Sequence, residues 1–217
     1  MAESPTAELH VFRARVHKAM NQTSDCVRDV KSALALDPTC REAEALRLQL
    51  KEASEEARQQ AVLRTLSGHL QEALCLINAA LESSPEDGRL YLFRGILYRR
   101  LEEFSSAIED LVQAAELSEP EEKKEQTVKE EAEESGSLQE EVQLQLALTY
   151  NDFAVQCFSR GLYAEATLLL SKAIREEKKL AGLYLNRGGE EAAAVSLKGS
   201  SSSFWAGSGS DNAASHS

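Results

Sequence analysis

The sequence contains few aromatic residues and few prolines, and this scarcity argues against a protein built from β-sheets. Phe, Trp and Tyr together make up 6% of the 217 residues, and proline occurs only four times. Ala, Leu and Glu dominate instead, and all three favour helices. A hydrophobic content of 42% is sufficient to bury a core. The composition therefore predicts an all-α protein.

An excess of basic residues is also missing. The chain has 24 Lys and Arg against 36 Asp and Glu, which gives a formal net charge of −12. Such a chain repels phosphate backbones and anionic lipid heads, so we expect neither nucleic acid nor a membrane surface as its partner. It lacks an apolar run of about 18 residues and the apolar core of a signal peptide. We expect a cytoplasmic, intracellular protein whose partners are other proteins.

Motifs for cofactors and catalysis are absent as well. The cysteines are too widely spaced for a zinc or dithiol site, and in a reducing compartment they are expected to be small buried apolar residues. These cysteines are Cys26, Cys40, Cys75 and Cys157. No glycine-rich loop for phosphate occurs, and no Ser or Cys has a histidine at a suggestive spacing. We expect no cofactor, no metal and no enzymatic activity.

What the sequence does contain is a repeat with a period of 34 residues. Residues 90–115, LYLFRGILYRRLEEFSSAIEDLVQAA, serve as the template. Four units share small and large residues at fixed places: Gly95, Phe104, Ala107, Leu111 and Ala114; Ala61, Leu70, Ala73, Ile77 and Ala80; Ala14, Cys26, Val30 and Ala33; and Ala154, Tyr163, Ala166, Leu170 and Ala173. Small residues let two antiparallel helices approach closely, so each unit predicts a helical hairpin.

These four units resemble the tetratricopeptide repeat family over about residues 7–188. The resemblance implies antiparallel hairpins stacked in a right-handed superhelical solenoid, in which each hairpin buries an apolar side of the next. Residues 1–118 are expected to hold repeats at about 7–40, 54–87 and 88–121, with a helical insert at 41–53. The insert lacks Gly and Pro and carries an apolar stripe, so it should extend the following helix. The stripe consists of Leu46, Leu50, Ala57 and Ala61.

The remaining segments depart from the repeat. Residues 119–137 are expected to form an acidic, coiled-coil-like linker, solvated and at most partly helical, or alternatively a docking strip for a basic partner. Residues 138–188 should hold a fourth repeat and the start of a fifth, beginning at Ala181. Residues 189–217 are rich in Ser, Gly and Ala and are expected to be a disordered tail. The unfinished repeat leaves an apolar face open, so we expect self-association.

Two units share a possible ion pair between their helices. Arg13 and Asp29 in the first unit, and Arg94 and Asp110 in the third, are each sixteen residues apart. The other two units lack both partners. The joint presence and absence predicts an ion pair within the hairpin, worth about 0 to 1 kcal/mol if it is exposed.

Two histidines offer the best case for other chemistry. His10 and His17 lie seven residues apart on one helical face and could place two imidazoles together for a metal, or as a catalytic pair. They occupy the places of Tyr91 and Tyr98 in the template, which favours packing.

The resemblance implies that the first helix of each hairpin lines a concave groove. Its lining would consist of Arg58, Val62, Arg89, Leu92, Ile96, Arg99, Arg100, Asn151, Val155 and Phe158. A cluster of arginines beside apolar side chains suits an acidic, hydrophobic peptide, although a salt-bridged surface has the same pattern. The family's clamp for chaperone C-termini needs Lys and Asn, but its places hold Val11, Arg15, Gln59, Leu92 and Phe93.

The sequence therefore predicts a non-catalytic scaffold that binds a peptide or helix in its groove. The alternative is a structural spacer within a larger assembly, with the groove unoccupied.

Overall fold

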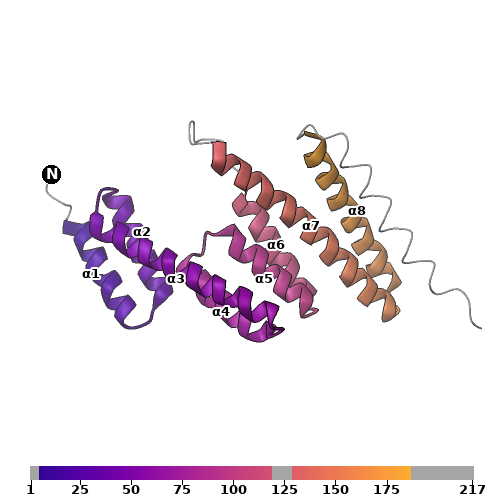
Figure 1. Cartoon of the computed structure of the whole chain (residues 1–217), viewed down its shortest axis with the longest axis horizontal. Coiled ribbons are helices and arrows are strands. Elements are labelled where there is room, and N and C mark those ends of the chain that lie inside the picture. Colours follow the sequence, from indigo (N-terminus) through magenta and orange to yellow (C-terminus); the bar gives the residue numbers. More distant parts are fainter. Residues whose placement is uncertain (1–4, 119–128, 187–217) are drawn as a thin grey trace, which may run out of the picture.

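The computed structural model describes residues 5–118 and 129–186, which form eight α-helices and no strand (Figure 1). Their bounds are α1 Pro5–Ala19, α2 Thr23–Leu36, α3 Arg41–Leu66, α4 Leu70–Ser83, α5 Gly88–Arg100, α6 Phe104–Ser118, α7 Lys129–Ser159 and α8 Tyr163–Asn186.

Consecutive helices pair into four hairpins: α1 with α2, α3 with α4, α5 with α6, and α7 with α8. The second helix of each hairpin also contacts the first helix of the next, so the hairpins follow one another along the long axis of the molecule (Figure 1). Buried apolar residues form four successive clusters along this axis rather than one central core. The predicted fold, an all-α solenoid of tetratricopeptide-type hairpins, is confirmed.

Small residues lie where the two helices of each hairpin approach. Ala14, Ala61, Gly95 and Ala154 occupy the same place in the four units, and all are buried. The approach is tightest in the third hairpin, where a Cβ added to Gly95 would lie 2.9 Å from Cγ of Leu111. Small residues at these positions therefore allow the two helices of each hairpin to pack closely against the large residues of the partner helix.

The turn within each hairpin uses the same backbone conformation. Asn21, Gly68, Glu102 and Gly161 occupy equivalent positions after the first helix, with φ values of 57°, 80°, 61° and 77°. This left-handed region accommodates glycine without strain and disfavours residues with a side chain. Two hairpins thus use glycine at the turn, while Glu102 is held there against its preference.

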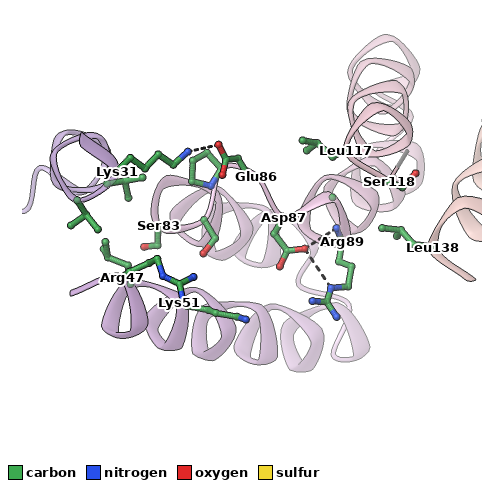
Figure 2. A pocket seen from close by; sticks show the side chains of 16 residues that line it. Lys31, Arg47, Lys51, Ser83, Glu86, Asp87, Arg89, Leu117, Ser118 and Leu138 are labelled. Carbon is green, nitrogen blue, oxygen red and sulfur yellow. Dashed lines mark hydrogen bonds and ion pairs between the residues drawn. The ribbon is translucent and has the colours of Figure 1, made fainter. Parts of the chain in front are cut away.

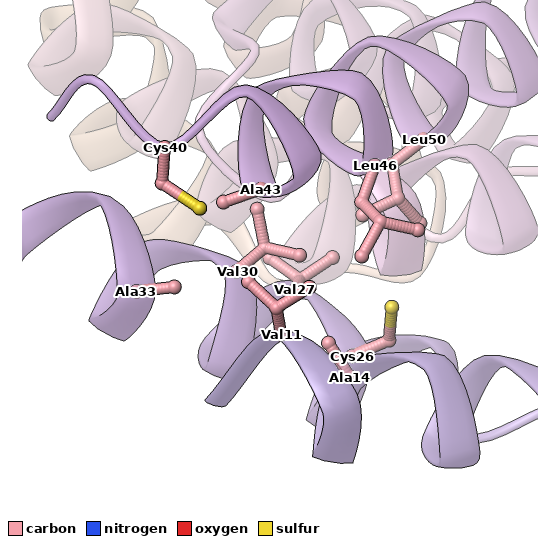
Figure 3. Packing of buried hydrophobic residues seen from close by; sticks show 10 residues of the cluster. All are labelled: Val11, Ala14, Cys26, Val27, Val30, Ala33, Cys40, Ala43, Leu46 and Leu50. Carbon is pink, nitrogen blue, oxygen red and sulfur yellow. The ribbon is translucent and has the colours of Figure 1, made fainter. Parts of the chain in front are cut away.

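Helix α3 is about twice as long as the other helices of the first three hairpins, because residues 41–53 are continuous with the first helix of the second hairpin. Its first half packs against α2 through Ala43, Leu46 and Leu50 (Figure 3), while its second half packs against α4. Leu46 and Leu50 follow Phe12 and Val16 by one period of 34 residues. The first half of α3 therefore takes the place of a first repeat helix that has no second helix of its own.

Both expected ion pairs are present. Arg13 donates to Asp29 from Nε at 2.8 Å and Nη2 at 2.5 Å, and Arg94 donates to Asp110 from Nε at 2.7 Å and Nη2 at 2.8 Å. The two carboxylates are buried, so these are not the exposed pairs for which a small contribution was estimated. The hydrogen bonds from Arg13 and the proximity of His10 hold the pKa of Asp29 below its usual range, against the opposing effect of burial.

The C-terminal half differs from the sequence expectation at two places. Helix α7 begins at Lys129, inside the segment expected to be a linker. Helix α8 continues through Ala181, where a fifth repeat was expected to begin. Pro38 and Pro85 follow the second helices of the first two hairpins, whereas no Pro or Gly interrupts residues 174–181. The expected tail at 189–217 and residues 119–128 of the expected linker lie outside the described residues.

The cysteines are reduced, and three of them are buried as expected: Cys26, Cys40 and Cys157. Cys75 is exposed, so the expectation was wrong for this residue. It lies two positions after the buried Ala73, which turns it about 200° around α4 from the core. Among the described helices, none is long and apolar enough to cross a bilayer.

Candidate protein-interaction site

The predicted groove residues fall into two groups, and the first lies where α5 begins. Arg58 on α3 donates to Glu55 from Nε at 2.8 Å and from Nη2 at 2.7 Å. Arg89 lies beside Asp87, with its Nε 3.4 Å from the carboxylate. Each acid also interacts electrostatically with the arginine of the other pair. The structure therefore brings Arg58 and Arg89 together across the boundary between the second and third hairpins.

These contacts stabilise the ionised form of Glu55. The hydrogen bond from Arg58 lowers the pKa of Glu55 to about 2, and a second hydrogen bond from Gln59 and the charge of Arg89 act in the same direction. Glu55 is thus fully ionised at neutral pH and neutralises part of the positive charge at this place.

The second group lies at the other end of α5. Arg99 donates to Asp152 of α7 at 2.8 Å, and its side chain is only 22% exposed. Arg100 is exposed beside it. Ten residues separate Arg89 from Arg99, or about 15 Å along a helix. The arginines therefore form two groups instead of the single cluster that the sequence predicted.

The apolar members of the predicted groove differ in accessibility. Leu92 is buried in the cluster that joins α5, α6 and α7, where Val142 and Leu146 cover it, so it does not line an open groove. Val62 and Ile96 are half-buried.

On α7, three predicted residues remain at the surface. Asn151, Val155 and Phe158 are exposed. The ring of Phe158 lies edge-on to that of Tyr163, with 5.3 Å between the centroids. Val155 and Phe158 give exposed apolar surface to α7, the helix whose Asp152 pairs with Arg99.

A cavity of about 540 Å³ lies beside the first group, lined by the first three hairpins and by Leu138 of α7 (Figure 2). Four basic side chains from three helices line it, and we call it the basic cavity. They are Lys31 of α2, Arg47 and Lys51 of α3, and Arg89 of α5. Its acidic residues are Glu86 and Asp87 in the turn before α5, and its apolar ones are Val27, Val30, Leu50, Leu117 and Leu138.

The long helix α3 accounts for the position of the cavity. Arg47 and Lys51 lie four residues apart, on one face of the part of α3 that the insert contributes. Gly88 at the start of α5 also lines the cavity. A Cβ at this position would lie 3.3 Å from the carbonyl oxygen of Ala114 in α6. The absence of this side chain lets the start of α5 lie close to α6.

The charges of the basic cavity are partly paired. Lys31 contacts Glu86 at 2.5 Å, and Arg47 donates to Glu44 at 2.6 and 2.8 Å. Lys51 has no ion pair with any residue that the structure describes. The lining holds four bases and two acids, and Glu44 outside the lining neutralises Arg47, so the excess at the cavity is one positive charge in a chain of net charge −12.

Sequence reasoning found only Arg89 among the four basic residues. Arg47 and Lys51 were missed because the insert was treated as an extension of a helix and not as part of a surface, and Lys31 was missed because only the first helix of each hairpin was expected to line the groove. The signal available was the spacing of Arg47 and Lys51, which lie four residues apart and therefore on one face of a helix.

The two histidines of α1 occupy packing positions. His10 and His17 each have a ring nitrogen 3.5 Å from a carboxylate oxygen of Asp29. Their counterparts Tyr91 and Tyr98 flank Arg94, whose guanidinium carbon lies 5.5 and 5.9 Å from the ring centroids. In the described ranges, no three His, Cys, Asp or Glu residues are grouped to hold a metal.

Known proteins resemble this chain over most of its length. Tetratricopeptide repeat protein 16 of Homo sapiens is 40% identical over 186 residues, which cover 86% of this chain and 20% of that protein. Its counterpart in Mus musculus is 37% identical over 183 residues, covering 84% of this chain and 22% of the relative. The chain therefore spans about a fifth of the length of these relatives. No family model matches the sequence.

Solved structures align with the chain at low sequence identity. The crystal structure of MamA matches 82% of this chain and 83% of its own, with a TM-score of 0.38 and 16% identity. A tetratricopeptide repeat protein from Parabacteroides merdae matches 90% of this chain and 92% of its own, with a TM-score of 0.28 and 18% identity.

Proposed function

Because most of the chain is similar to a tetratricopeptide repeat protein, we propose that it is a non-catalytic scaffold that binds an acidic, partly apolar segment of another protein at the basic cavity. The relatives and the stacked hairpins support an interaction scaffold. The observation that carries the finer proposal is the gathering of four basic side chains around an apolar floor in a strongly acidic chain.

The chemistry of the cavity selects the partner. Carboxylates of a peptide complement Lys51 and Arg89, and the half-buried Leu117 and Leu138 offer apolar surface to a side chain that enters the cavity. A volume of about 540 Å³ falls within the range of ordinary ligand clefts. It accommodates a few side chains rather than a whole helix, so we propose an extended or partly helical peptide.

The second group of groove residues lengthens the surface that a partner contacts. A peptide seated at Arg89 reaches Arg99 and Arg100 after about five extended residues, since each spans about 3.3 Å. Val155 and Phe158 of α7 then offer apolar surface beside them. We therefore expect the partner segment to contain acidic residues about five positions apart, with apolar residues between and after them.

A structural spacer remains the competing function, and one observation favours it. The terminal helices α1 and α8 both expose apolar side chains, as expected of an element that packs end to end in an assembly. In that case, the basic cavity and the groove stay empty.

A peptide-binding assay separates the two functions. Fluorescence anisotropy should be measured with labelled acidic peptides that contain Leu and Phe, and with the same peptides in which Lys replaces each acid. Lys51→Glu inverts a charge at the basic cavity, and Lys178→Glu makes the same change on α8, away from the cavity. We expect Lys51→Glu to weaken binding of the acidic peptides by about tenfold or more, or ~1.4 kcal/mol.

The control Lys178→Glu should bind as the unchanged protein does, and added salt should weaken binding because it screens exposed charges. Equal losses in the two variants, or no binding of either peptide set, would contradict peptide recognition at the cavity and favour the spacer.

A further inference from the structure

The outer face of α1 carries an apolar stripe that no part of the described chain covers. Leu9, Phe12, Val16 and Met20 follow one another at intervals of three and four residues, which places them on one side of the helix. Their exposed fractions are 69%, 67%, 42% and 59%. A stripe of this kind is normally found beneath another element.

The same repeat positions are covered elsewhere in the chain. One period of 34 residues further on, Ala43, Leu46 and Leu50 of α3 are buried against α2. In the third hairpin, Leu90 and Leu97 correspond to Leu9 and Val16, and their exposed fractions are 1% and 0% because α4 packs on them. At these two places the preceding second helix covers the positions, whereas on α7, which α6 precedes, the equivalent Asp152 and Gln156 are half-buried and Arg160 is exposed.

The second half of α3 provides an internal comparison. Because α2 packs on the first half of α3, the second half has no preceding helix on the face that corresponds to the stripe of α1. The residues at the corresponding positions are all exposed: Glu56, Gln59, Leu63 and Ser67. Three of these four residues are polar, whereas all four on α1 are apolar. The chain thus has polar residues at most positions of a face that stays open, and the stripe on α1 does not follow that pattern.

The residues that do the covering also occupy fixed repeat positions. Val27, Val30 and Leu34 cover α3 from α2, and Leu74, Ile77 and Leu81 cover α5 from α4. The corresponding residues of α8 are Thr167, Leu170 and Ile174. Ile77 and Leu81 are 0% and 7% exposed, but Leu170 and Ile174 are 39% and 52% exposed. Helix α8 therefore presents a covering face with nothing in the described chain to cover.

We propose that α1 of one copy docks against α8 of a second copy, so that the chain associates head to tail. The contact repeats the geometry between α4 and α5, with the stripe of α1 on Leu170 and Ile174 of the second copy. One polar contact carries over as well, because Arg94 donates from Nη1 to Asn78 of the preceding hairpin at 2.9 Å. Arg13 corresponds to Arg94 and is 57% exposed, and Ser171 of the second copy takes the place of Asn78.

The contact joins two different surfaces, so every copy keeps one free face at each end. Such a contact builds open chains unless the rotation between copies closes a ring. The proposal concerns the ends of the solenoid and does not depend on what binds in the basic cavity.

Sedimentation velocity of the 217-residue chain tests the proposal, over about 1 μM to 1 mM, where contacts of this size dissociate. We expect the mean mass to rise with concentration beyond that of a dimer. Phe12→Glu places a charge on the apolar face of α1, and Ile174→Glu places one on the apolar face of α8. Each should weaken association by about tenfold or more. Gln59→Glu introduces the same charge at the corresponding position on α3 and should leave association unchanged.

Mixing the two variants decides between a head-to-tail contact and a symmetric one. The Phe12→Glu variant keeps a working α8, and the Ile174→Glu variant keeps a working α1, so the mixture should form dimers and stop there. Circular dichroism of each variant should match that of the unchanged chain, since Phe12 and Ile174 are exposed.

Three outcomes overturn the proposal. The chain stays monomeric over the whole range, which means that another occupant covers the stripe. Alternatively, only one of the two variants loses association, which indicates that like faces pair. Finally, the mixture contains no more dimer than the separate variants.

Discussion

Replacing Gly95 with alanine should destabilise the third hairpin, although alanine is the better helix former. The added Cβ would lie 2.9 Å from Cγ and 3.1 Å from Cδ2 of Leu111, closer than carbon atoms normally approach. Overpacking of a buried site costs about 1 to 3 kcal/mol. Alanine in place of glycine within a helix returns about 1 kcal/mol. We therefore expect a net loss of about 1 kcal/mol in the free energy of unfolding.

The first hairpin shows how the clash can be relieved. There, Ala14 takes the place of Gly95 and Val30 takes the place of Leu111. The larger residue on the first helix is thus accompanied by a smaller residue on the second. Leu111→Val alone should cost about 1 kcal/mol because it leaves a small void. In the double variant of Gly95→Ala and Leu111→Val, the void receives the new methyl group, and the stability should return to near that of the unchanged protein.

Urea unfolding followed by far-ultraviolet circular dichroism measures all four proteins of this cycle. The two substitutions should be non-additive by about 1 to 2 kcal/mol, as expected for residues in contact. If Gly95→Ala stabilises the protein by the full helix-propensity gain, or if the two changes are additive, then the close approach does not constrain this position.

Three further predictions follow from the turn and the ion pairs. Glu102→Gly should stabilise the protein by about 0.5 to 1 kcal/mol, measured by thermal unfolding, because glycine adopts its φ of 61° without strain; an unchanged or lower melting temperature would contradict this. Asp110→Asn should cost about 1 to 3 kcal/mol in urea unfolding, since Arg94 loses a charged partner, whereas an exposed pair would cost less than 1 kcal/mol. The pKa of Glu55 is about 2 when paired with Arg58 and 4.5 in the unfolded chain, so its contribution is present above pH 4.5 and lost as the pH falls towards 2. Glu55→Gln should flatten the pH dependence of stability in that window, and an unaltered slope would count against the pairing.

The hairpins could be predicted because their determinants are local and periodic. Small residues such as Ala61 and Gly95 recur at the points of closest approach, and the two Arg–Asp pairs recur at the same spacing. Spacing along the chain fixes these contacts, since both partners belong to one hairpin. The sequence therefore contained enough to place them.

The basic cavity could not be predicted in the same way, because its residues come from four hairpins, and its basic residues from three. Lys31 of the first hairpin and Arg89 of the third line the same cavity, and the insert in α3 supplies Arg47 and Lys51 to it. The repeat position of Leu92 predicted that it lines the groove, but its burial depends on how α7 packs against α5. Contacts between hairpins depend on such packing, and a repeat alignment does not contain it.

The length of α3 has a mechanical consequence. Its 26 residues span about 39 Å and serve the first hairpin with one half and the second with the other. Neither hairpin can detach without breaking hydrogen bonds in the middle of this helix, so the two should yield to a stretching force in one step. In the third and fourth hairpins, each helix belongs to one hairpin alone. These two hairpins therefore share no helix with a neighbour and should unfold one at a time.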